Sequence, residues 1–574
     1  MGNLTVAEFL LKTFIKSGVK RIYGIAGDSL NALTEAVRAN GDFEWIHVRH
    51  EEVAAFACGA EAHLTQSLTV CAGSCGPGNL HLINGLYDCH KSGVPVLAIA
   101  AQIPTAEIGT NYFQETKPEQ IFEGCSHFCE VVSQPDQIPR MLKIAMETAI
   151  AKRGVSVLVI SGDTALKELK KEAAVVNIKL PPACTRPTDQ RIDDLAHVLN
   201  AAKKVTILGG AGCAGAHTEL LALAGKLKAP IVHALRGKEY IEFDNPYDVG
   251  MTGLLGFSSG YHAMMDCDLL LMLGTDFPYT QFYPETPTIQ VDERGENIGR
   301  RTKVDLGVVG DVKETLTLVL PKLDDKEDRR HLDNAIKHYE ETRKDLDELA
   351  VEGNIKDSVH PQYVAKLISD LASDDAIFTC DVGTPTVWAA RYLKMNGRRR
   401  LLGSFKHGSM ANALPQAIGA QVAHPGRQVI SMSGDGGFAM LMGDFLTLNQ
   451  HDLPVKTVIF NNSALGFVEV EMMAAGLIES ATSLKNPNFA KLAEAVGIRG
   501  FRVNQPSELR SALEEAFSTE GPALVDVVVN RLELAIPPHI SAEQITGFGL
   551  FAMKAVLNQK GSELVDLART NLWR

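Results

Sequence analysis

Short runs of consecutive apolar residues recur along most of this chain, and longer amphipathic stretches separate them. Leu269–Leu273 is one such run, and Trp45–Val48 and Val455–Phe460 are mostly apolar runs of the same kind. Continuous apolar runs bounded by turn residues are typical of strands buried in a parallel sheet, and the amphipathic stretches are typical of crossover helices. The sequence therefore predicts an α/β fold with three doubly wound parallel-sheet domains, followed by an amphipathic C-terminal tail.

Two polar segments interrupt this alternation and suggest where the domains meet. The residues from Pro181 to Gln190 predict a linker, and the charged residues 324–348 predict a polar helical connector. The predicted domains cover residues 1–183, 184–334, 335–532 and 533–574.

Composition and charge narrow the class of protein. The 574 residues are too many for a single hydrophobic core. The formal net charge of −13 argues against nucleic-acid binding. No apolar run reaches the length of about 18 residues that a membrane-spanning helix needs. Val6–Leu11 predicts an amphipathic helix rather than a secretion signal, and the ten cysteines are scattered as in a reduced cytoplasmic protein.

The clearest candidate chemistry lies between two predicted strands of the last third. Gly434-Asp435-Gly436 follows one strand, and Asn461-Asn462 follows the next. Parallel strands deliver both groups to the same edge of a sheet. A carboxylate, an amide oxygen and a backbone carbonyl suit Mg²⁺, and glycines let the backbone approach a phosphate. Gly-Asp-Gly alone is a common turn, but its spacing from the two asparagines favours a binding site.

With this pattern the sequence resembles the thiamine diphosphate-dependent group of pyruvate oxidases, acetolactate synthases and pyruvate decarboxylases. The resemblance covers almost the whole chain. It includes His50–Phe56, Gly73–Asn79 and Tyr112–Glu115. The sequence is most similar to the bacterial membrane-binding pyruvate oxidases that use a quinone. This resemblance implies a pyrimidine-binding first domain, an FAD-binding second domain, a diphosphate-binding third domain and a membrane-binding tail.

The resemblance also implies the residues that hold thiamine diphosphate and its metal. Asp435, Asn462 and the Ala464 carbonyl are the implied Mg²⁺ ligands. The implied thiamine diphosphate site consists of Glu51, Gly408, Ser409, Met410, Asp435, Gly436, Gly437, Asn462, Ser463, Ala464, Leu465, Gly466, Phe467 and Val468. Met410 is the implied apolar wedge under the bent cofactor, although methionine is also common core filler.

Glu51 is the implied proton relay, because the family's glutamate at this motif hydrogen-bonds the aminopyrimidine ring. A carboxylate in a first helical turn also has a simpler explanation in the helix dipole. Phe113 and Gln114 are implied to line the substrate end of the pocket, together with Phe467 and Glu471.

The middle domain carries a glycine-rich turn after the strand Val205–Leu208. Residues 210–215 fit G-x-G-x-x-G, but no acidic residue follows about 20 positions later, so a Rossmann NAD site is disfavoured. The resemblance instead implies FAD in an extended pose. The implied FAD residues are Thr252, Gly253, Leu254, Leu255, Thr275, Asp276, Phe277, Pro278, Tyr279 and Asp292. The alternative is a structural domain without a flavin, as in related decarboxylases.

The tail from Leu550 to Arg574 has four basic residues against two acidic ones. Apolar residues recur at helical spacing at Ile545, Phe548, Ala552, Ala555 and Val556, and again at Leu564, Leu567, Ala568 and Leu572. Two short amphipathic helices would suit reversible contact with a phospholipid membrane, which the resemblance also implies. The alternative is a terminal helix docked on the body of the protein.

Together these observations predict an enzyme that oxidatively decarboxylates pyruvate to acetate and CO₂ with thiamine diphosphate, Mg²⁺ and FAD. The resemblance implies that electrons pass to ubiquinone, and that the protein is a homotetramer, cytoplasmic and peripheral on the inner face of the cell membrane. Three alternatives stay open. They are a phosphate-dependent oxidase that makes acetyl phosphate and hydrogen peroxide, an acetolactate synthase, and a non-enzymatic membrane-associated binding protein on the same fold.

Overall fold

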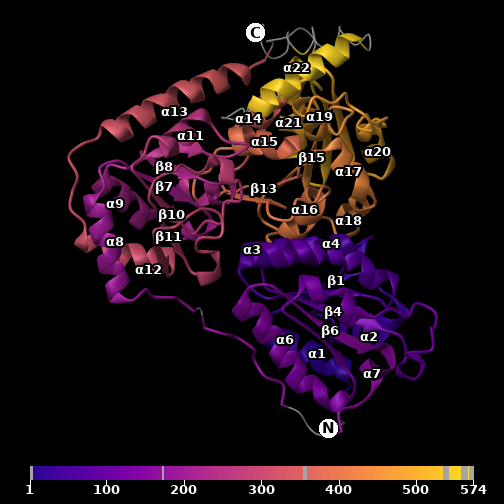
Figure 1. Ribbon diagram of the computed structural model, residues 1–574. Coiled ribbons are helices and arrows are strands. Elements are labelled where there is room, and N and C mark those ends of the chain that lie inside the picture. The colour runs from indigo at the N-terminus through magenta and orange to yellow at the C-terminus, as the bar shows by residue number, and fades with distance from the viewer. Residues whose placement is uncertain are drawn as a thin grey trace.

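The computed structural model describes residues 4–170, 174–181, 183–352, 358–533, 542–557 and 567. Figure 1 shows three α/β units, with the first at the bottom, the middle unit at the left and the third at the upper right. Each unit is built on a six-stranded sheet, and every strand pairing in the three sheets is parallel. The predicted fold class is therefore confirmed.

The first sheet has the strand order β2-β1-β3-β4-β6-β5. Its strands are β1 (Arg21–Gly24), β2 (Glu44–His47), β3 (Thr69–Gly73), β4 (Val96–Gln102), β5 (Phe128–Val132) and β6 (Val155–Ser161). Its helices are α1 (Val6–Lys16), α2 (Asn31–Asn40), α3 (Glu51–Thr65), α4 (Pro77–Ser92), α5 (Pro118–Ile121), α6 (Ile138–Lys152) and α7 (Gly162–Leu166). The central strands β3, β4 and β6 are buried along their whole length, because helices cover both faces.

The third sheet repeats this topology in the order β14-β13-β15-β16-β18-β17. Its strands are β13 (Ile377–Cys380), β14 (Arg400–Gly403), β15 (Val429–Gly434), β16 (Lys456–Asn461), β17 (Arg499–Val503) and β18 (Ala523–Val528). Its helices are α14 (Pro361–Leu371), α15 (Thr384–Tyr392), α16 (Ala413–Ala423), α17 (Asp435–Leu441), α18 (Phe445–Gln450), α19 (Gly466–Ala474), α20 (Phe489–Ala495) and α21 (Pro506–Ser518). In both units the strand order reverses between the first and third strands, and such a switch point is where ligands bind.

The middle sheet has a different order, β12-β11-β10-β7-β8-β9, which is the order of dinucleotide-binding folds. Its strands are β7 (Val205–Gly209), β8 (Ile231–His233), β9 (Asp248–Met251), β10 (Leu269–Leu273), β11 (Thr288–Asp292) and β12 (Leu306–Val309). Its helices are α8 (Asp189–Ala201), α9 (His217–Leu227), α10 (Lys238–Ile241), α11 (Ser258–Met265), α12 (Val312–Val319) and α13 (Arg330–Leu349). The switch point of this sheet lies between β7 and β10.

The predicted polar connector is the long helix α13, which crosses the top of the middle unit in Figure 1. It packs on α11, where Tyr339 lies 6.0 Å from Phe257 between ring centroids and His338 hydrogen-bonds the Ser258 hydroxyl. Residue 334, where the second predicted domain ends, lies inside this helix. The C-terminal half of α13 also bonds the third unit, because Arg343 donates to the Arg391 carbonyl and the Tyr392 hydroxyl donates to the Leu346 carbonyl. The predicted domain boundaries stay predictions.

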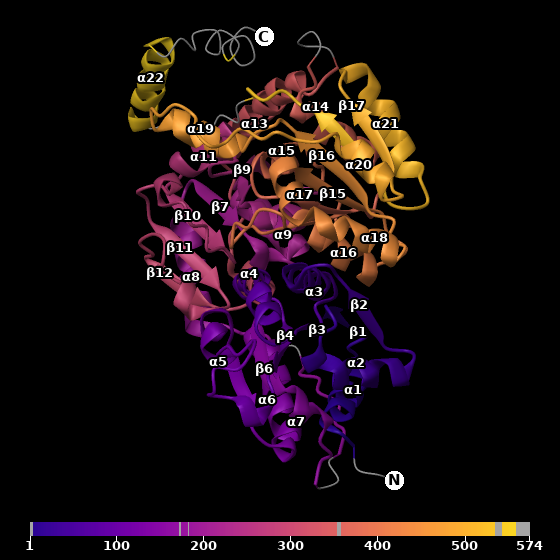
Figure 2. The same cartoon turned by 90° about the vertical axis from the view of Figure 1, so that its right-hand side faces the viewer.

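The helix α22 (Ala542–Leu557) packs against α19 through one apolar side (Figure 2). Phe551 is buried beside Met473, and the Lys554 Nζ donates to the Gly476 carbonyl at 2.7 Å. On other positions of the helix Ile545 and Met553 are exposed to 64% and 58%. Among the described residues, no helix is long and apolar enough to cross a membrane. The predicted second tail helix, with Leu564, Ala568 and Leu572, lies outside the described residues.

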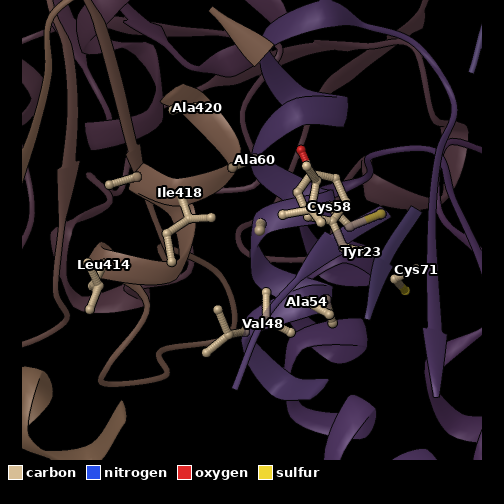
Figure 3. Close-up of a cluster of buried hydrophobic side chains, with 14 of the residues drawn as sticks. Tyr23, Val48, Ala54, Cys58, Ala60, Cys71, Leu414, Ile418 and Ala420 are labelled. Atoms are coloured by element: carbon tan, nitrogen blue, oxygen red, sulfur yellow. The ribbon is translucent and has the colours of Figure 1, made fainter. Parts of the chain in front are cut away.

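The first and third units share one hydrophobic core, which is centred on the crossing of α3 and α16. Figure 3 shows Ala60 of α3 beside Ile418 and Ala420 of α16 at this contact, while Cys58 points toward Tyr23 and Cys71 of the first sheet. The backbones approach so closely that a Cβ on Gly419 would lie 2.0 Å from the Ala57 carbonyl oxygen. Small residues at this crossing therefore fix how the two units sit against each other.

We expect Gly419→Ala to destabilise the protein, because the added methyl group meets backbone atoms that cannot rotate away. Overpacking of this kind costs about 1–3 kcal/mol. Urea unfolding would measure the loss. Gly426→Ala is the matched control, since a Cβ there meets nothing within 4 Å. Equal stabilities of the two variants would show that the crossing tolerates expansion.

Candidate active site

The predicted metal-binding residues lie at the carboxyl edge of the third sheet. Asp435 directly follows β15, and Asn462 directly follows the neighbouring strand β16. Asp381 follows β13, which pairs with β15 on its other side. The edge therefore gathers three polar side chains at and beside the switch point of the sheet, as the strand–helix–strand spacing predicted.

Asp435 is a buried carboxylate held by neutral donors. Its Oδ1 accepts from the Gly436 amide at 2.9 Å, and its Oδ2 accepts from the Ser463 amide and the Asn486 Nδ2, both at 2.7 Å. Burial raises the pKa of Asp435, and these hydrogen bonds offset only part of that effect. A cation beside the carboxylate would compensate for the lost solvation.

The second predicted ligand, Asn462, lies in the tight turn between β16 and α19. Its Oδ1 accepts from the Ala464 amide at 3.1 Å, and the intervening Ser463 has a left-handed φ of 57°. A Cβ on Gly466 would lie 2.6 Å from the Asn462 Nδ2, so a larger residue there would displace the Asn462 amide. One carboxylate, one amide and one backbone carbonyl form the hard oxygen set that Mg²⁺ prefers.

The predicted apolar wedge lies over the Gly-Asp-Gly turn. A Cβ on Gly436 would lie 2.9 Å from the Leu465 Cδ2 and 3.4 Å from the Met410 Cε. Gly437 faces Asp381, whose Oδ2 would be 2.3 Å from a Cβ there. The structure thus brings together three separate predicted segments, namely Gly408–Met410, Asp435–Gly437 and Asn462–Gly466.

The loop before Met410 is anchored to the first unit. The Ser404 hydroxyl donates to the Asp88 Oδ1 at 2.6 Å and accepts from the Ser409 amide at 3.0 Å. The Asn84 Nδ2 donates to the Ser409 hydroxyl at 2.8 Å. Side chains of α4 therefore set the position of a loop that belongs to the third unit.

Glu51 begins α3 and is buried in a polar pocket of the first unit. Its Oε2 lies 2.9 Å from the His81 Nδ1. Its Oε1 lies against Gly78, where a Cβ would be 2.9 Å away. Gln114 packs on the same loop, and its Oε1 accepts from the Cys75 thiol at 3.3 Å. Phe113 beside it is 77% exposed, which is unusual for a phenylalanine.

The two halves of the predicted site do not meet within one chain. Among the described residues, no hydrogen bond, ion pair or ring contact joins Glu51 to the 408–410 loop. The neighbouring Glu52 makes that link, because its Oε1 accepts from the Asn84 Nδ2 that also reaches Ser409. Successive helical residues point in different directions, so Glu51 lies on another side of α3 from Glu52 and contacts His81 instead.

Helix α19 carries the predicted substrate-side residues toward the middle unit. Phe467 packs against the same core cluster as Leu255 of the predicted flavin site. Burial raises the pKa of the Tyr279 phenol, and the negative charge of Glu471 raises it further. Glu471 and Tyr279 are therefore close neighbours, although they were predicted for different cofactors. Val468, also on α19, is partly exposed.

The predicted flavin residues line the carboxyl edge of the middle sheet. Gly253 has a φ of 93°, and a Cβ there would lie 2.8 Å from the Phe277 ring and 3.7 Å from the Tyr279 ring. Thr252 is buried, and its hydroxyl has no hydrogen-bond partner among the described residues. A buried hydroxyl without a partner is costly, so a ligand at this edge would satisfy it.

Asp292 ends β11 at the other side of the same edge. Its Oδ1 accepts from the Arg294 amide and the Asn297 Nδ2, and burial raises its pKa. Four strand spacings of about 4.8 Å separate β11 from β9, which precedes Thr252. Residues so far apart fit an extended dinucleotide. Asp276 is instead engaged by Arg301 at 2.9 Å, and Thr275 packs against Gly210.

Sequence reasoning missed four residues that shape these sites. The Asn486 amide bridges Asp435 and Asn461 at the edge of the third sheet. Arg391 donates to the Leu255 and Gly256 carbonyls beside the predicted flavin site. Asp381 accepts from the Ala413 and Gly434 amides, and burial raises its pKa to about 7. Asn84 was missed as well. Only Asp381, as an acid at a strand's carboxyl end, carried a signal in the sequence.

The first and third units share one topology and carry the predicted thiamine diphosphate residues, and the middle unit has the strand order of dinucleotide-binding folds. This combination defines a class of three-domain enzyme. Family models agree with this division. They describe the N-terminal TPP binding domain, the central domain and the C-terminal TPP binding domain of thiamine pyrophosphate enzymes, and they match residues 4–121, 192–319 and 381–527. Thiamine pyrophosphate is another name for thiamine diphosphate.

Several full-length relatives support the same assignment. The putative thiamine pyrophosphate-containing protein YdaP of Bacillus subtilis is 37% identical over 572 residues, which is 99% of each chain. Pyruvate oxidase of Lactiplantibacillus plantarum is 30% identical over 92% of this chain and 89% of its own. Acetolactate synthase of Arthrospira platensis is 31% identical over 93% of this chain and 96% of its own. The chain belongs to the thiamine pyrophosphate enzyme family.

We expect Asn486→Ala to weaken Mg²⁺ binding, because the variant no longer orients the Asp435 carboxylate. Loss of such a supporting hydrogen bond costs about 10–100-fold in metal affinity. The measurement is thiamine diphosphate binding by fluorescence quenching at increasing Mg²⁺. Asn488→Ala serves as control, since it removes only the cap of α20. An equal shift in both variants would contradict the supporting role.

Asp88→Asn should stabilise the protein at neutral pH. Burial raises the pKa of Asp88 to about 6, and the Ser404 hydrogen bond opposes this only in part. The folded state thus favours the protonated Asp88 carboxyl. The stability that the protein gains from this protonation is lost as the pH rises from about 4 through about 6. Above pH 6 the variant should gain up to about 3 kcal/mol.

Urea unfolding at pH 4 and pH 7.5 would check this expectation, with the gain present only at the higher pH. Asp42→Asn is the control, because Asp42 is exposed. A gain of equal size at both pH values would rule out titration of Asp88 as its cause.

Proposed function

We propose that this enzyme oxidatively decarboxylates pyruvate to acetate and CO₂, with thiamine diphosphate, Mg²⁺ and FAD as cofactors and ubiquinone as the electron acceptor. One observation carries the proposal. Helix α19 faces the predicted flavin site, because Glu471 acts electrostatically on Tyr279 of that site. Electron transfer from one cofactor to the other requires this proximity.

Each predicted residue then has a defined task. Thiamine diphosphate supplies an electron sink for the loss of CO₂. Asp435, Asn462 and the Ala464 carbonyl would hold Mg²⁺. Met410 and Leu465 form an apolar wall above Gly436 that would exclude water. Glu51 would act as the carboxyl group that orients the cofactor's ring and exchanges a proton with it.

A complete site requires a second copy of the chain, because no described contact joins Glu51 to its own 408–410 loop. Exposed apolar side chains flank both halves of the site. Leu80, Tyr112 and Phe113 lie on the Glu51 side, and Met440 and Met442 lie on the Asp435 side. Large apolar groups exposed together suit burial against another subunit. The homotetramer is proposed on this basis.

The membrane role is proposed for α22 and the residues after it. Ile545, Leu550 and Met553 are exposed on the described part of the helix. Their burial at a bilayer surface would bring the flavin site near a membrane-dissolved quinone. The protein would then be cytoplasmic and peripheral on the inner membrane face.

Two related activities remain as alternatives, since the relatives include both a pyruvate oxidase and acetolactate synthases. An acetolactate synthase would consume pyruvate without net reduction of the flavin. A phosphate-dependent oxidase would need phosphate and would release acetyl phosphate and hydrogen peroxide.

The deciding experiment follows flavin absorbance after anaerobic addition of pyruvate to the enzyme loaded with thiamine diphosphate, Mg²⁺ and FAD. We expect rapid bleaching without phosphate, reversed by ubiquinone and faster with phospholipid vesicles. Glu51→Gln should keep its FAD but bleach at least about 100-fold more slowly, because it lacks the proton relay.

Other outcomes point elsewhere. An oxidised flavin with pyruvate consumed indicates acetolactate chemistry, and a strict need for phosphate indicates the other oxidase. An oxidised flavin with no consumption by the fully loaded enzyme overturns the proposal and favours a binding protein.

A further inference from the structure

Three positively charged side chains lie around the carboxyl edge of the middle sheet without an ion pair. Arg236 follows β8, Arg294 follows β11, and Lys406 belongs to the loop after β14 of the third unit. In the part of the chain that the structure describes, none of the three forms a salt bridge with a carboxylate. Unpaired cations gathered in one place create a positive potential that favours an anion.

The two arginines each have a structural task. The Arg236 Nη2 donates to the Ser92 carbonyl at 3.2 Å, and the Arg294 Nη2 donates to the Lys152 carbonyl at 3.3 Å. Ser92 and Lys152 are the last residues of α4 and α6, where the helix dipole favours a cation. These contacts tie the middle unit to the first unit. They use one N–H of each guanidinium, so the others stay available to a ligand.

Lys406 has no such task. Its side chain makes no hydrogen bond or ion pair with any residue that the structure describes. Its backbone is nevertheless held on both sides. The Gly408 amide donates to the Ser404 carbonyl at 2.8 Å. The Nε2 of the next residue, His407, lies 2.8 Å from the Asn84 Oδ1. An unpaired ammonium group is therefore carried by a loop whose course is fixed.

The charged neighbours of Lys406 show where its ammonium group lies. Arg236 and Asp276 act on it electrostatically, and so do Arg294 and Asp292. Asp276 follows β10, Asp292 ends β11, and Arg236 follows β8. In the strand order β11-β10-β7-β8 these charges come from both sides of β7. The ammonium group therefore lies over the middle of this sheet edge.

A cavity between the three units places the loop at the same point independently. Its lining includes Ala211 of the turn after β7, Arg236 after β8, and Phe405 of the third unit. Phe405 directly precedes Lys406, so the loop reaches the turn after β7. In dinucleotide-binding folds the diphosphate lies at the turn after the first strand, beside the switch point of the sheet.

The two ends of the predicted flavin site lie on either side of this point. Asp292 ends β11, Thr252 follows β9, and β7 lies between these two strands in the sheet. An extended FAD that reaches from one to the other has its diphosphate near the middle of its length. Asp276 does not oppose a phosphate there, because Arg301 pairs with it at 2.9 Å.

We propose that Lys406 binds the diphosphate of the dinucleotide cofactor, with Arg236 and Arg294 supplying positive charge on either side. The inference rests on the function proposed above, which requires FAD. The loop that carries Lys406 continues into Gly408–Met410 of the predicted thiamine diphosphate site. One loop of the third unit thus serves both cofactors.

The test measures how fast FAD leaves the diluted holoenzyme, from the rise in fluorescence of the released flavin. Lys406→Met removes the charge and keeps a long side chain, and Lys406→Arg keeps a cation. Lys491→Met is the matched control. Lys491 is exposed on α20, which packs on β17 and β18 at the opposite edge of the third sheet from β14. Phosphorus NMR of the bound FAD reports on the diphosphate itself.

We expect Lys406→Met to release FAD at least about tenfold faster than the wild type, which corresponds to the loss of one charge-assisted hydrogen bond. Release from Lys406→Arg and from Lys491→Met should stay within about threefold of the wild type. The diphosphate resonances of FAD should shift in Lys406→Met. The visible absorbance spectrum of the flavin ring should stay unchanged, because Lys406 acts at the diphosphate and not at the ring.

A free phosphate ion offers the same chemistry as the diphosphate, so inorganic phosphate is the second probe. It is added to the FAD-loaded wild type and to FAD-loaded Lys406→Met, and the width of its phosphorus resonance is compared. We expect no difference between the two proteins. Broadening in the wild type alone, with equal rates of FAD release, would assign the lysine to a free phosphate and overturn the inference.

Two further results would also overturn it. Release of FAD from Lys406→Met within about twofold of the wild type would show that the lysine does not hold the cofactor. Faster release with unchanged diphosphate resonances would show that the substitution only loosens the loop. A wild type that binds no FAD would instead remove the proposed function together with the inference, which separates that case from the others.

Discussion

The close crossing of α3 and α16 determines how this molecule can form a catalytic site. Alanines of α3 and Gly419 of α16 let the two backbones touch, and the shared core locks the first and third units into one body. Because the start of α3 is thereby fixed, the directions of Glu51 and Glu52 are fixed as well. Glu52 joins the 408–410 loop of its own chain through Asn84, and Glu51 instead lies in the pocket formed by His81 and Gly78.

Buried polar groups complement this apolar contact. Asp88 and Asn84, both on α4, hold Ser404 and Ser409 across the interface between the units. Charged and amide groups placed here cost solvation, and each is matched by a hydrogen bond with specific geometry. The apolar crossing therefore supplies attraction between the units, while the polar contacts select the one arrangement in which the 404–410 loop has its observed shape.

The sequence predicted those parts of the site that depend on local pattern. Apolar runs located β15 and β16, and the parallel crossover between them implied that Asp435 and Asn462 meet. The supporting residue Asn486 could not be found in this way, because it reaches Asp435 from a loop with no periodic pattern. The orientation of Glu51 could not be predicted from the sequence either, because it depends on how α3 packs against α16, which begins more than 350 residues after Glu51.

In the middle unit the glycine-rich motif and the predicted ligand-binding edge are separate features. Its glycine-rich turn is explained by packing alone, because a Cβ on Gly212 would lie 2.6 Å from the Gly274 Cα. In a dinucleotide fingerprint the acidic residue follows the second strand, but here Asp292 follows β11, on the far side of the switch point. Under the proposed function, a dinucleotide held at Asp292 would extend along the sheet edge toward Thr252, whose neighbour Gly253 lies beside Tyr279, and Glu471 acts electrostatically on Tyr279.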